Sequence, residues 1–143
     1  MPKKNKPDLA SQQVYRVLDA NLNRLREALR VIEEYYRFMR LDKRCAVSLK
    51  SMRHSLDAVE AGIGRGNLLA GRDTGSDPFA DGNRPEELFR AKAGDVLRAN
   101  FKRGQEAGRV IEEFLKVTSA SELSKKAKIV RFALYSLEKK FPE

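Results

Sequence analysis

The chain repeats one 18-residue segment of itself. Residues 17–34 read VLDANLNRLREALRVIEE, residues 96–113 read VLRANFKRGQEAGRVIEE, and twelve of the eighteen positions are identical. Apolar residues recur at three- and four-residue spacing in both copies, which predicts two amphipathic helices. A helix that only fills a core could keep this spacing while its polar residues changed, so the retained polar residues indicate a function. They are Asn21 and Asn100, Arg24 and Arg103, and Glu27 and Glu106.

Apolar spacing predicts four helices in all, and no segment has the pattern of a strand. The first helix covers residues 11–40, and the second begins after an N-cap at Asp42 and ends near residue 61.

The second half of the chain carries its own start signals. A third helix is predicted to begin at Pro85, to be interrupted near Asp95, which can cap it again, and to end near Thr118. The fourth helix follows a capping-box pattern formed by Ser119 and Glu122.

The second and fourth predicted helices also resemble each other, at an offset of 78 residues. Lys50, Arg53, Leu56 and Glu60 correspond to Lys128, Arg131, Leu134 and Glu138. The repeated unit is therefore a helical hairpin, and two hairpins bury their apolar faces best against each other. We predict an all-α protein, an antiparallel four-helix bundle made from a duplicated hairpin. Its parts are a disordered basic leader (1–10), a single helical domain (11–143) with repeat units at about 11–61 and 85–141, and a long Gly-rich loop (62–84).

The formal net charge of +9 suits a partner that carries phosphate. Glutamates alternate with the repeated arginines, however, which favours small phosphorylated molecules over nucleic acid. No apolar run approaches the roughly 18 to 20 residues of a membrane span. Cys45 is the only cysteine, so an internal disulfide is excluded. With no apolar signal segment at the start, a cytoplasmic location is expected.

On a helical wheel, Asn21 and Arg24 fall within the apolar arc, and Glu27 lies at its margin. A buried guanidinium is costly unless an anion meets it, and a buried amide needs hydrogen-bond partners. Those partners come either from the bundle, with Arg24 paired to a carboxylate and Asn21 fixing the helix register, or from a ligand. Because both copies keep the same residues, we favour a ligand.

Two further features of the repeat predict its packing. Gly104 and Gly108 replace Leu25 and Leu29 in the second copy, which predicts open space on that flank of the helix. Charged residues retained on the opposite face are expected to form surface ion pairs at spacings of three and four. These residues are Arg30, Glu33, Arg109 and Glu112.

The segment GRDTG at residues 71–75 is a second candidate site. Arg72 can bind phosphate oxygens through its bidentate fork, Asp73 suits Mg²⁺, and Thr74 offers a hydroxyl. The alternative is that these residues only form a turn. The nearby GIGRGN neither follows a strand nor carries the Lys-Ser/Thr of a P-loop, so it is weak as a nucleotide motif.

Three segments resemble those of a known family, and the likeness covers residues 15–141. They are RVLDANLNRLREALRVIEE, GRDT and DVLRANFKRGQEAGRVIEE. The family is the small all-helical hydroxymethylpyrimidine-phosphate kinase, a domain often fused ahead of thiamine-phosphate synthase and sometimes found alone; this chain looks like the free-standing form. The resemblance implies ATP-dependent phosphorylation of 4-amino-5-hydroxymethyl-2-methylpyrimidine phosphate to its diphosphate in thiamine biosynthesis.

The acceptor in that reaction is a phosphate, already ionised at neutral pH, so no side chain has to remove a proton from it. Transfer then needs positioning and charge neutralisation by cationic side chains and by Mg²⁺ held on carboxylates. The catalytic candidates are Arg24, Arg72, Asp73 and Arg103. The candidates for binding substrate and ATP are Asn21, Glu27, Thr74, Asn100, Lys102 and Glu106. The candidate Mg²⁺ ligands are Asp73, Glu27 and Glu106.

In this hypothesis one Asn-Arg-Glu set holds the acceptor phosphate and the other holds the tail of ATP, with Arg72 and Asp73 closing over them. The expected partners are the pyrimidine phosphate, ATP and Mg²⁺, with no nucleic acid and no membrane, and a homodimer is a possible assembly. Two alternatives stay open. One is a non-catalytic basic bundle that binds nucleic acid or an acidic protein, and the other is a sensor that binds the pyrimidine phosphate without turnover.

Overall fold

The computed structural model of the chain describes residues 9–82 and 88–141, and these residues form five α-helices and no strand. The prediction of an all-helical protein is confirmed. The helices are α1 (Leu9–Glu34), α2 (Lys43–Ile63), α3 (Arg65–Gly71), α4 (Ala93–Leu115) and α5 (Ser124–Lys139). Shorter turns are a π-helix at Tyr35–Met39 and 3-10 helices at Thr74–Ser76 and Ser121–Leu123. Most of the predicted leader, residues 1–8, lies outside the described residues.

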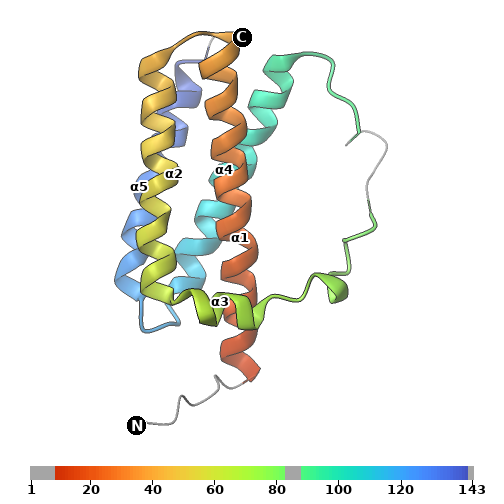
Figure 1. Cartoon of the computed structure of the whole chain (residues 1–143), viewed down its shortest axis with the longest axis vertical. Coiled ribbons are helices and arrows are strands. Elements are labelled where there is room, and N and C mark those ends of the chain that lie inside the picture. The colour runs from red at the N-terminus through yellow and green to blue at the C-terminus, as the bar shows by residue number, and fades with distance from the viewer. Residues whose placement is uncertain (1–8, 83–87, 142–143) are drawn as a thin grey trace.

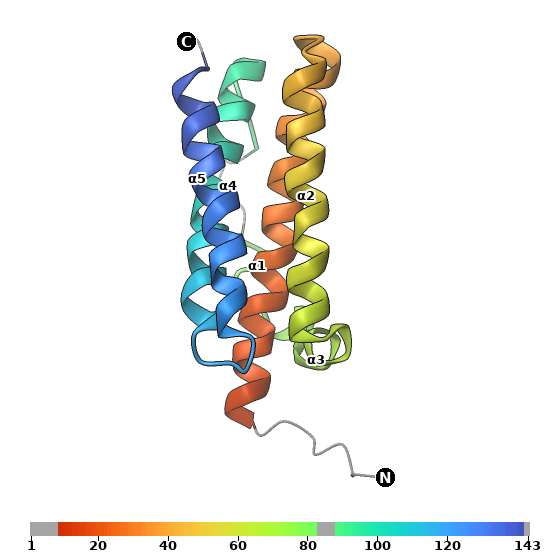
Figure 2. The ribbon, with the colours of Figure 1, turned by 90° about the vertical axis from the view of Figure 1, so that its left-hand side faces the viewer.

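The four long helices lie side by side, and α1 runs antiparallel to both α2 and α4 (Figures 1 and 2). The most extensive packing joins α1 to α4, followed by α4 with α5 and α1 with α2. Helix α3 lies across the end of α1 nearer the N-terminus (Figure 1). Helix α1 therefore contacts α2, α3 and α4, which makes it the central element of the molecule. Within the described ranges, no helix combines the length and hydropathy needed to cross a bilayer.

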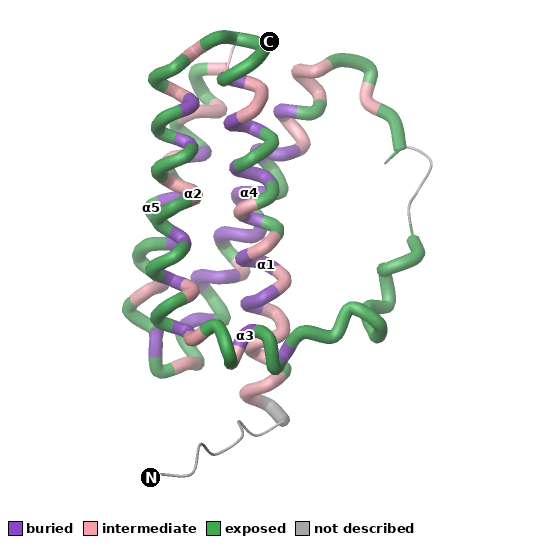
Figure 3. Tube along the Cα trace, viewed as in Figure 1, coloured by how far each residue is buried: buried purple, intermediate pink, exposed green. Residues whose placement is uncertain are grey.

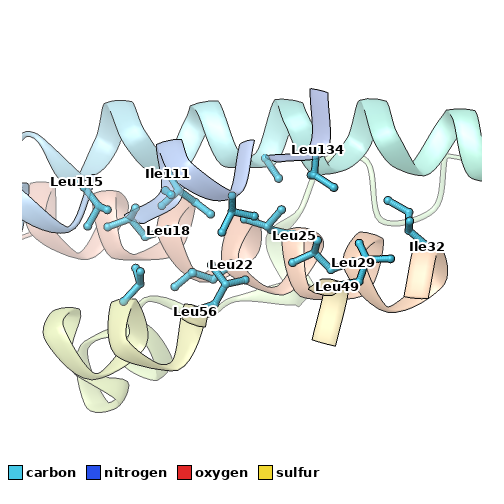
Figure 4. Packing of buried hydrophobic residues seen from close by; sticks show 14 of the residues in the cluster. Leu18, Leu22, Leu25, Leu29, Ile32, Leu49, Leu56, Ile111, Leu115 and Leu134 are labelled. Carbon is cyan, nitrogen blue, oxygen red and sulfur yellow. The ribbon is translucent and has the colours of Figure 1, made fainter. Parts of the chain in front are cut away.

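One apolar core runs along the inward faces of the long helices (Figure 3). Leu18, Leu25 and Leu29 of α1 are fully buried and belong to one cluster with Leu56 of α2 and Leu134 of α5 (Figure 4). A leucine buried in this way stabilises the fold by roughly 1.5–3 kcal/mol relative to an exposed one. The three- and four-residue spacing seen in the sequence therefore marks the residues that hold the helices together.

The start signals of the helices were predicted with mixed success. The N-cap at Asp42 is confirmed, because its carboxylate accepts a hydrogen bond from the Cys45 backbone N–H at 3.0 Å. The helix predicted to begin at Pro85 begins instead at Ala93. Residues 85–87 lie outside the described residues, and Phe89 is exposed and not helical. Asp95 does help to cap α4, by accepting from the Lys92 N–H at 3.2 Å.

The capping box predicted for Ser119 and Glu122 is wrong. A 3-10 turn, Ser121–Leu123, precedes α5. The turn before it is closed by Thr118, whose hydroxyl accepts a hydrogen bond from the Ala120 N–H at 3.1 Å. Neither this 3-10 helix nor α5 has a side chain that caps its N-terminus.

The segment predicted as a loop at 62–84 contains α3. Gly64 ends α2 with a φ of 97°. Glycine adopts this left-handed conformation without steric strain, whereas a residue with a Cβ atom is strained there. The chain then turns directly into α3, where Leu68 is buried in the core. A seven-residue helix is too short to show a clear period, and for this reason the pattern was missed.

Gly104 and Gly108 do not open space, contrary to the prediction. A Cβ atom on Gly104 would lie 2.8 Å from Cδ1 of Leu134, and one on Gly108 would lie 3.2 Å from Cβ of Arg131. Both neighbours belong to α5. The two glycines therefore allow α5 to pack closely on α4.

Each hairpin, α1–α2 and α4–α5, has a buried ion pair at the same repeat position. Glu33 accepts hydrogen bonds from Arg53 Nε and Nη2 at 3.4 and 3.3 Å, and Glu112 accepts from Nε and Nη2 of Arg131, the second at 3.1 Å. Glu33 and Glu112 are only 3% and 4% exposed, so the prediction that they lie on the surface is wrong. Arg30 does form the expected pair with Glu33, at 3.4 Å, whereas Arg109 pairs with Glu113, also at 3.4 Å, and not with Glu112.

Tyr36 gives a prediction about alkaline pH. Its side chain is buried, and this burial raises the pKa of its hydroxyl from 10.0 to about 12. Between these values the unfolded chain has lost a proton that the folded chain keeps, so stability falls as the pH rises from about 10 to about 12. Tyr36→Phe is expected to flatten this decline, as measured by urea unfolding at pH values within and below that range. An unchanged decline in the variant would contradict the assignment.

Candidate functional site

A cavity of about 550 Å³ lies between α1 and α4, within the size range of small-molecule sites. Its lining consists of five residues from each copy of the sequence repeat, and each has its counterpart in the other copy. The pairs are Asn21 and Asn100, Arg24 and Arg103, Glu27 and Glu106, Ala28 and Ala107, and Val31 and Val110. The polar residues that the repeat retains are thus brought together at one place, which we call the central cavity.

The register of α1 against α4 sets the order of these groups along the central cavity. A Cβ atom on Gly104 would lie 3.6 Å from Cβ of Ala28, so these two residues face each other. The helices are antiparallel and rise 1.5 Å per residue, so residue 106 lies at about the level of residue 26. Glu27 and Glu106 therefore occupy the middle of the cavity.

The arginines and asparagines lie progressively further from the middle. Counted along the helices from Glu27 and Glu106, Arg24 and Asn21 lie toward one end, and their repeat counterparts lie toward the other. We call the two ends the Arg24 end and the Arg103 end.

The two arginines of the central cavity are exposed and unpaired. Arg24 and Arg103 form no ion pair or hydrogen bond with any residue that the structure describes, and the same holds for Glu27 and Glu106. The alternative in which Arg24 is neutralised by a carboxylate across the bundle is therefore wrong. The wheel placed Arg24 within the apolar arc, and this part of the arc lines the cavity and is open to solvent.

The two asparagines are buried and held in place by their own helices. Asn21 donates to the Val17 carbonyl at 2.9 Å, and Asn100 donates to the Val96 carbonyl at 2.8 Å. Neither bond crosses to another helix, so these bonds do not fix the register between helices. Each bond fixes the direction of one amide at an end of the cavity.

A second cavity, of about 580 Å³, adjoins the Arg24 end. It shares Asn21 and Arg24 with the central cavity, and residues of the predicted GRDT segment form its outer wall. These residues are Arg72, Asp73 and Thr74, with Asp77 beside them. The structure thus joins both predicted sites through Arg24.

The outer wall is held to α1 by three adjacent residues, 71–73, which we call the strap. Both Nε and Nη2 of Arg72 donate to the buried carboxylate of Asp19, at 2.8 and 2.7 Å, and this bonding raises the pKa of Arg72. Arg16 donates to the Asp73 carbonyl at 2.8 Å. A Cβ atom on Gly71 would lie 2.7 Å from the Arg16 backbone nitrogen, so only glycine fits. The bidentate fork predicted to bind phosphate is therefore occupied by Asp19.

Asp19 and Arg16 were missed from the sequence. One signal was available for Asp19, because it is among the six positions at which the two copies differ, and its counterpart Arg98 has the opposite charge. A charge reversal within an otherwise retained repeat marks a contact that only one copy makes.

The carboxylates predicted to bind Mg²⁺ are divided between the two cavities. Glu27 and Glu106 line the central cavity, whereas Asp73 lines the second. The Asp73 carboxylate accepts from the hydroxyl and the backbone N–H of Ser76, and these bonds lower its pKa and keep it ionised. No group of three or more metal-binding side chains occurs among the described residues. Two carboxylates still suit Mg²⁺, which is usually held by one or two together with substrate phosphates.

Lys102 is not brought to either cavity. It lies two residues after Asn100, about 200° further round the helix, and its ammonium lies 3.7 Å from the carboxylate of Glu138. The structure therefore shows a contact between α4 and α5 for Lys102, on the side away from the cavities.

The chain belongs to the ThiD2 family, whose sequence pattern matches residues 16–140. It is similar to the thiamine-phosphate synthase of Thermosynechococcus vestitus, with 44% identity over 132 residues, 92% of this chain and 36% of that protein. The corresponding protein of Nostoc punctiforme is 42% identical over 127 residues, 89% of this chain and 35% of its own length. The chain thus spans about a third of the length of the curated relatives it matches. A comparison with solved structures found no match.

Proposed function

We propose that this protein acts in thiamine biosynthesis as a kinase that transfers a phosphoryl group from ATP to 4-amino-5-hydroxymethyl-2-methylpyrimidine phosphate. The observation that carries the proposal is the presence of two unpaired arginines, Arg24 and Arg103, in one cavity. Guanidinium groups bind phosphate oxygens strongly, and a kinase of this kind must hold two phosphorylated molecules at once. A repeated anion site meets that need directly.

We further propose that the fold is a four-helix bundle made from a duplicated hairpin. The pair Glu33–Arg53 in the first hairpin has its counterpart in Glu112–Arg131 of the second. Because equivalent residues make equivalent contacts in both hairpins, duplication accounts for the structure as well as for the sequence.

The proposed chemistry assigns a role to each group in the cavity. The acceptor phosphate is ionised at neutral pH, so the site needs no general base. Arg24 and Arg103 would neutralise the reacting phosphates, and Mg²⁺ would be held at the centre by Glu27 and Glu106 together with phosphate oxygens. The amides of the two asparagines would orient the ligands at the ends.

A second candidate is the step named for the relatives, the formation of thiamine phosphate. The relatives are about three times as long as the matched region, so their name describes a protein of which this chain corresponds to one part. The kinase proposal explains why this helical chain matches only one part of each relative, because the kinase family that it resembles is often fused to thiamine-phosphate synthase.

One assay tests the kinase proposal, and a parallel titration with DNA tests the nucleic-acid-binding alternative. Purified protein is incubated with ATP, Mg²⁺ and the pyrimidine monophosphate, and the products are followed by ³¹P NMR. The kinase predicts ADP and the pyrimidine diphosphate in equal amounts. Binding of the monophosphate without ADP formation would indicate a sensor, and DNA binding that weakens steeply with salt would indicate a basic nucleic-acid-binding bundle.

A further inference from the structure

The second cavity breaks the symmetry of the central one. It adjoins the Arg24 end, where it shares Asn21 and Arg24 with the central cavity, and its outer wall comes from the strap and the residues just after it. The Arg24 end therefore continues into a further space of about 580 Å³, whereas the described residues that line the central cavity at the Arg103 end all come from α1 and α4. The two ends can accept ligands of different length.

The two proposed ligands also differ in length. A nucleoside triphosphate carries a chain of three phosphates on its sugar, whereas the acceptor carries one phosphate beside its ring. A terminal phosphate at Arg24 leaves the rest of the nucleotide the space of the second cavity. Small apolar residues, Ala28 and Val31 with their counterparts in α4, give the central cavity walls that suit a flat ring.

Building on the proposed function, we infer that the donor nucleotide enters through the second cavity and places its terminal phosphate at Arg24. The acceptor phosphate then lies at the Arg103 end. An oxygen of the acceptor phosphate forms a bond to the terminal phosphorus of the donor, and the bond from that phosphorus to the bridging oxygen breaks. The nucleoside diphosphate leaves with the electron pair of that bond, and no proton needs to move.

In this arrangement the strap positions the wall of the donor site. Asp19 holds Arg72, and Arg16 holds the carbonyl of Asp73, so Thr74 and Asp73 face the path of the nucleotide. Asp19 acts through Arg72, and we therefore assign it as a positioning residue. The strap contributes nothing to the lining of the Arg103 end.

Gly71→Ala tests this division of the site. The added methyl group would lie 2.7 Å from a backbone nitrogen of α1 and 2.9 Å from a backbone oxygen, so the strap has to move. Calorimetric titration with Mg²⁺ and the β,γ-imido analogue of ATP is expected to show affinity weakened by about tenfold or more. Titration with the pyrimidine monophosphate is expected to be unchanged. Gly66→Ala in the same helix meets no atom within 4 Å and serves as the matched control for both titrations.

Two further variants separate the inference from a folding defect. Asp19→Asn conserves shape, releases the Arg72 fork and is expected to weaken the nucleotide alone. Arg103→Ala is expected to weaken the monophosphate alone. Circular dichroism confirms that each variant is folded. The assignment would be overturned if Gly71→Ala and Asp19→Asn lowered the affinity for both ligands equally. It would also be overturned if Arg103→Ala abolished the affinity for the nucleotide. Selective binding of each ligand at its own end without turnover would refute the proposed kinase activity but support the assignment of the two ligand sites.

Discussion

Replacing Arg24 or Arg103 by alanine is expected to lower kcat/KM for phosphoryl transfer by about 100-fold or more, with the helical content unchanged. Each guanidinium lines the central cavity without an acidic partner among the described residues, so its charge is available to a phosphate group. Both side chains are exposed, and removing either leaves no buried group unsatisfied. Steady-state kinetics with ATP and the pyrimidine monophosphate, alongside circular dichroism, provide the measurement.

Arg109→Ala is the matched control for these two variants. Arg109 lies on α4, is exposed, and contacts Glu113 at 3.4 Å outside the cavity. Its replacement should leave kcat/KM within about twofold, because exposed ion pairs of this kind contribute little. Near-normal rates in either Arg24→Ala or Arg103→Ala would refute the role of paired anion sites.

Arg131→Ala is expected to lower the free energy of unfolding by about 3–5 kcal/mol. Glu112 is 4% exposed and accepts two hydrogen bonds from Arg131, which raise the pKa of that guanidinium. Without Arg131 the carboxylate would remain buried and uncompensated. Arg131 also stacks over Phe132, with 5.0 Å between its guanidinium carbon and the ring centroid, so packing is lost as well. Urea unfolding at neutral pH measures the change.

The first hairpin supplies the comparison for this prediction. Arg53→Ala removes the equivalent partner of Glu33, but its side chain is 22% exposed against 12% for Arg131, so water can compensate more of the loss. We expect a smaller decrease in stability for Arg53→Ala. A decrease below about 1 kcal/mol for Arg131→Ala would show that the buried pair contributes no more than a surface one.

Local periodicity was sufficient to predict the long helices and the residues that meet in the central cavity. Leu18, Leu25 and Leu29 are buried as their spacing predicts, and Asn21 and Arg24 line one cavity with their repeat counterparts. Both results depend on the direction in which a helix points its side chains, and the sequence contains this information.

Features that depend on contacts between distant segments could not be predicted in the same way. Leu68 is buried because α3 packs on α1, and no pattern within seven residues reveals this contact. The glycines of α4 predicted space because nothing in the sequence shows how closely α5 approaches. Arg72 was assigned to phosphate because the carboxylate that occupies it, Asp19, lies 53 residues away.

Arg24 forms part of the wall of both cavities, and this has a thermodynamic consequence. A ligand that orders the Arg24 side chain from one side reduces the conformational entropy that a second ligand, on the other side, must lose when it binds. Occupancy of the two spaces is cooperative where the ligands on both sides contact Arg24, and linkage then requires that each ligand tighten the other by the same factor.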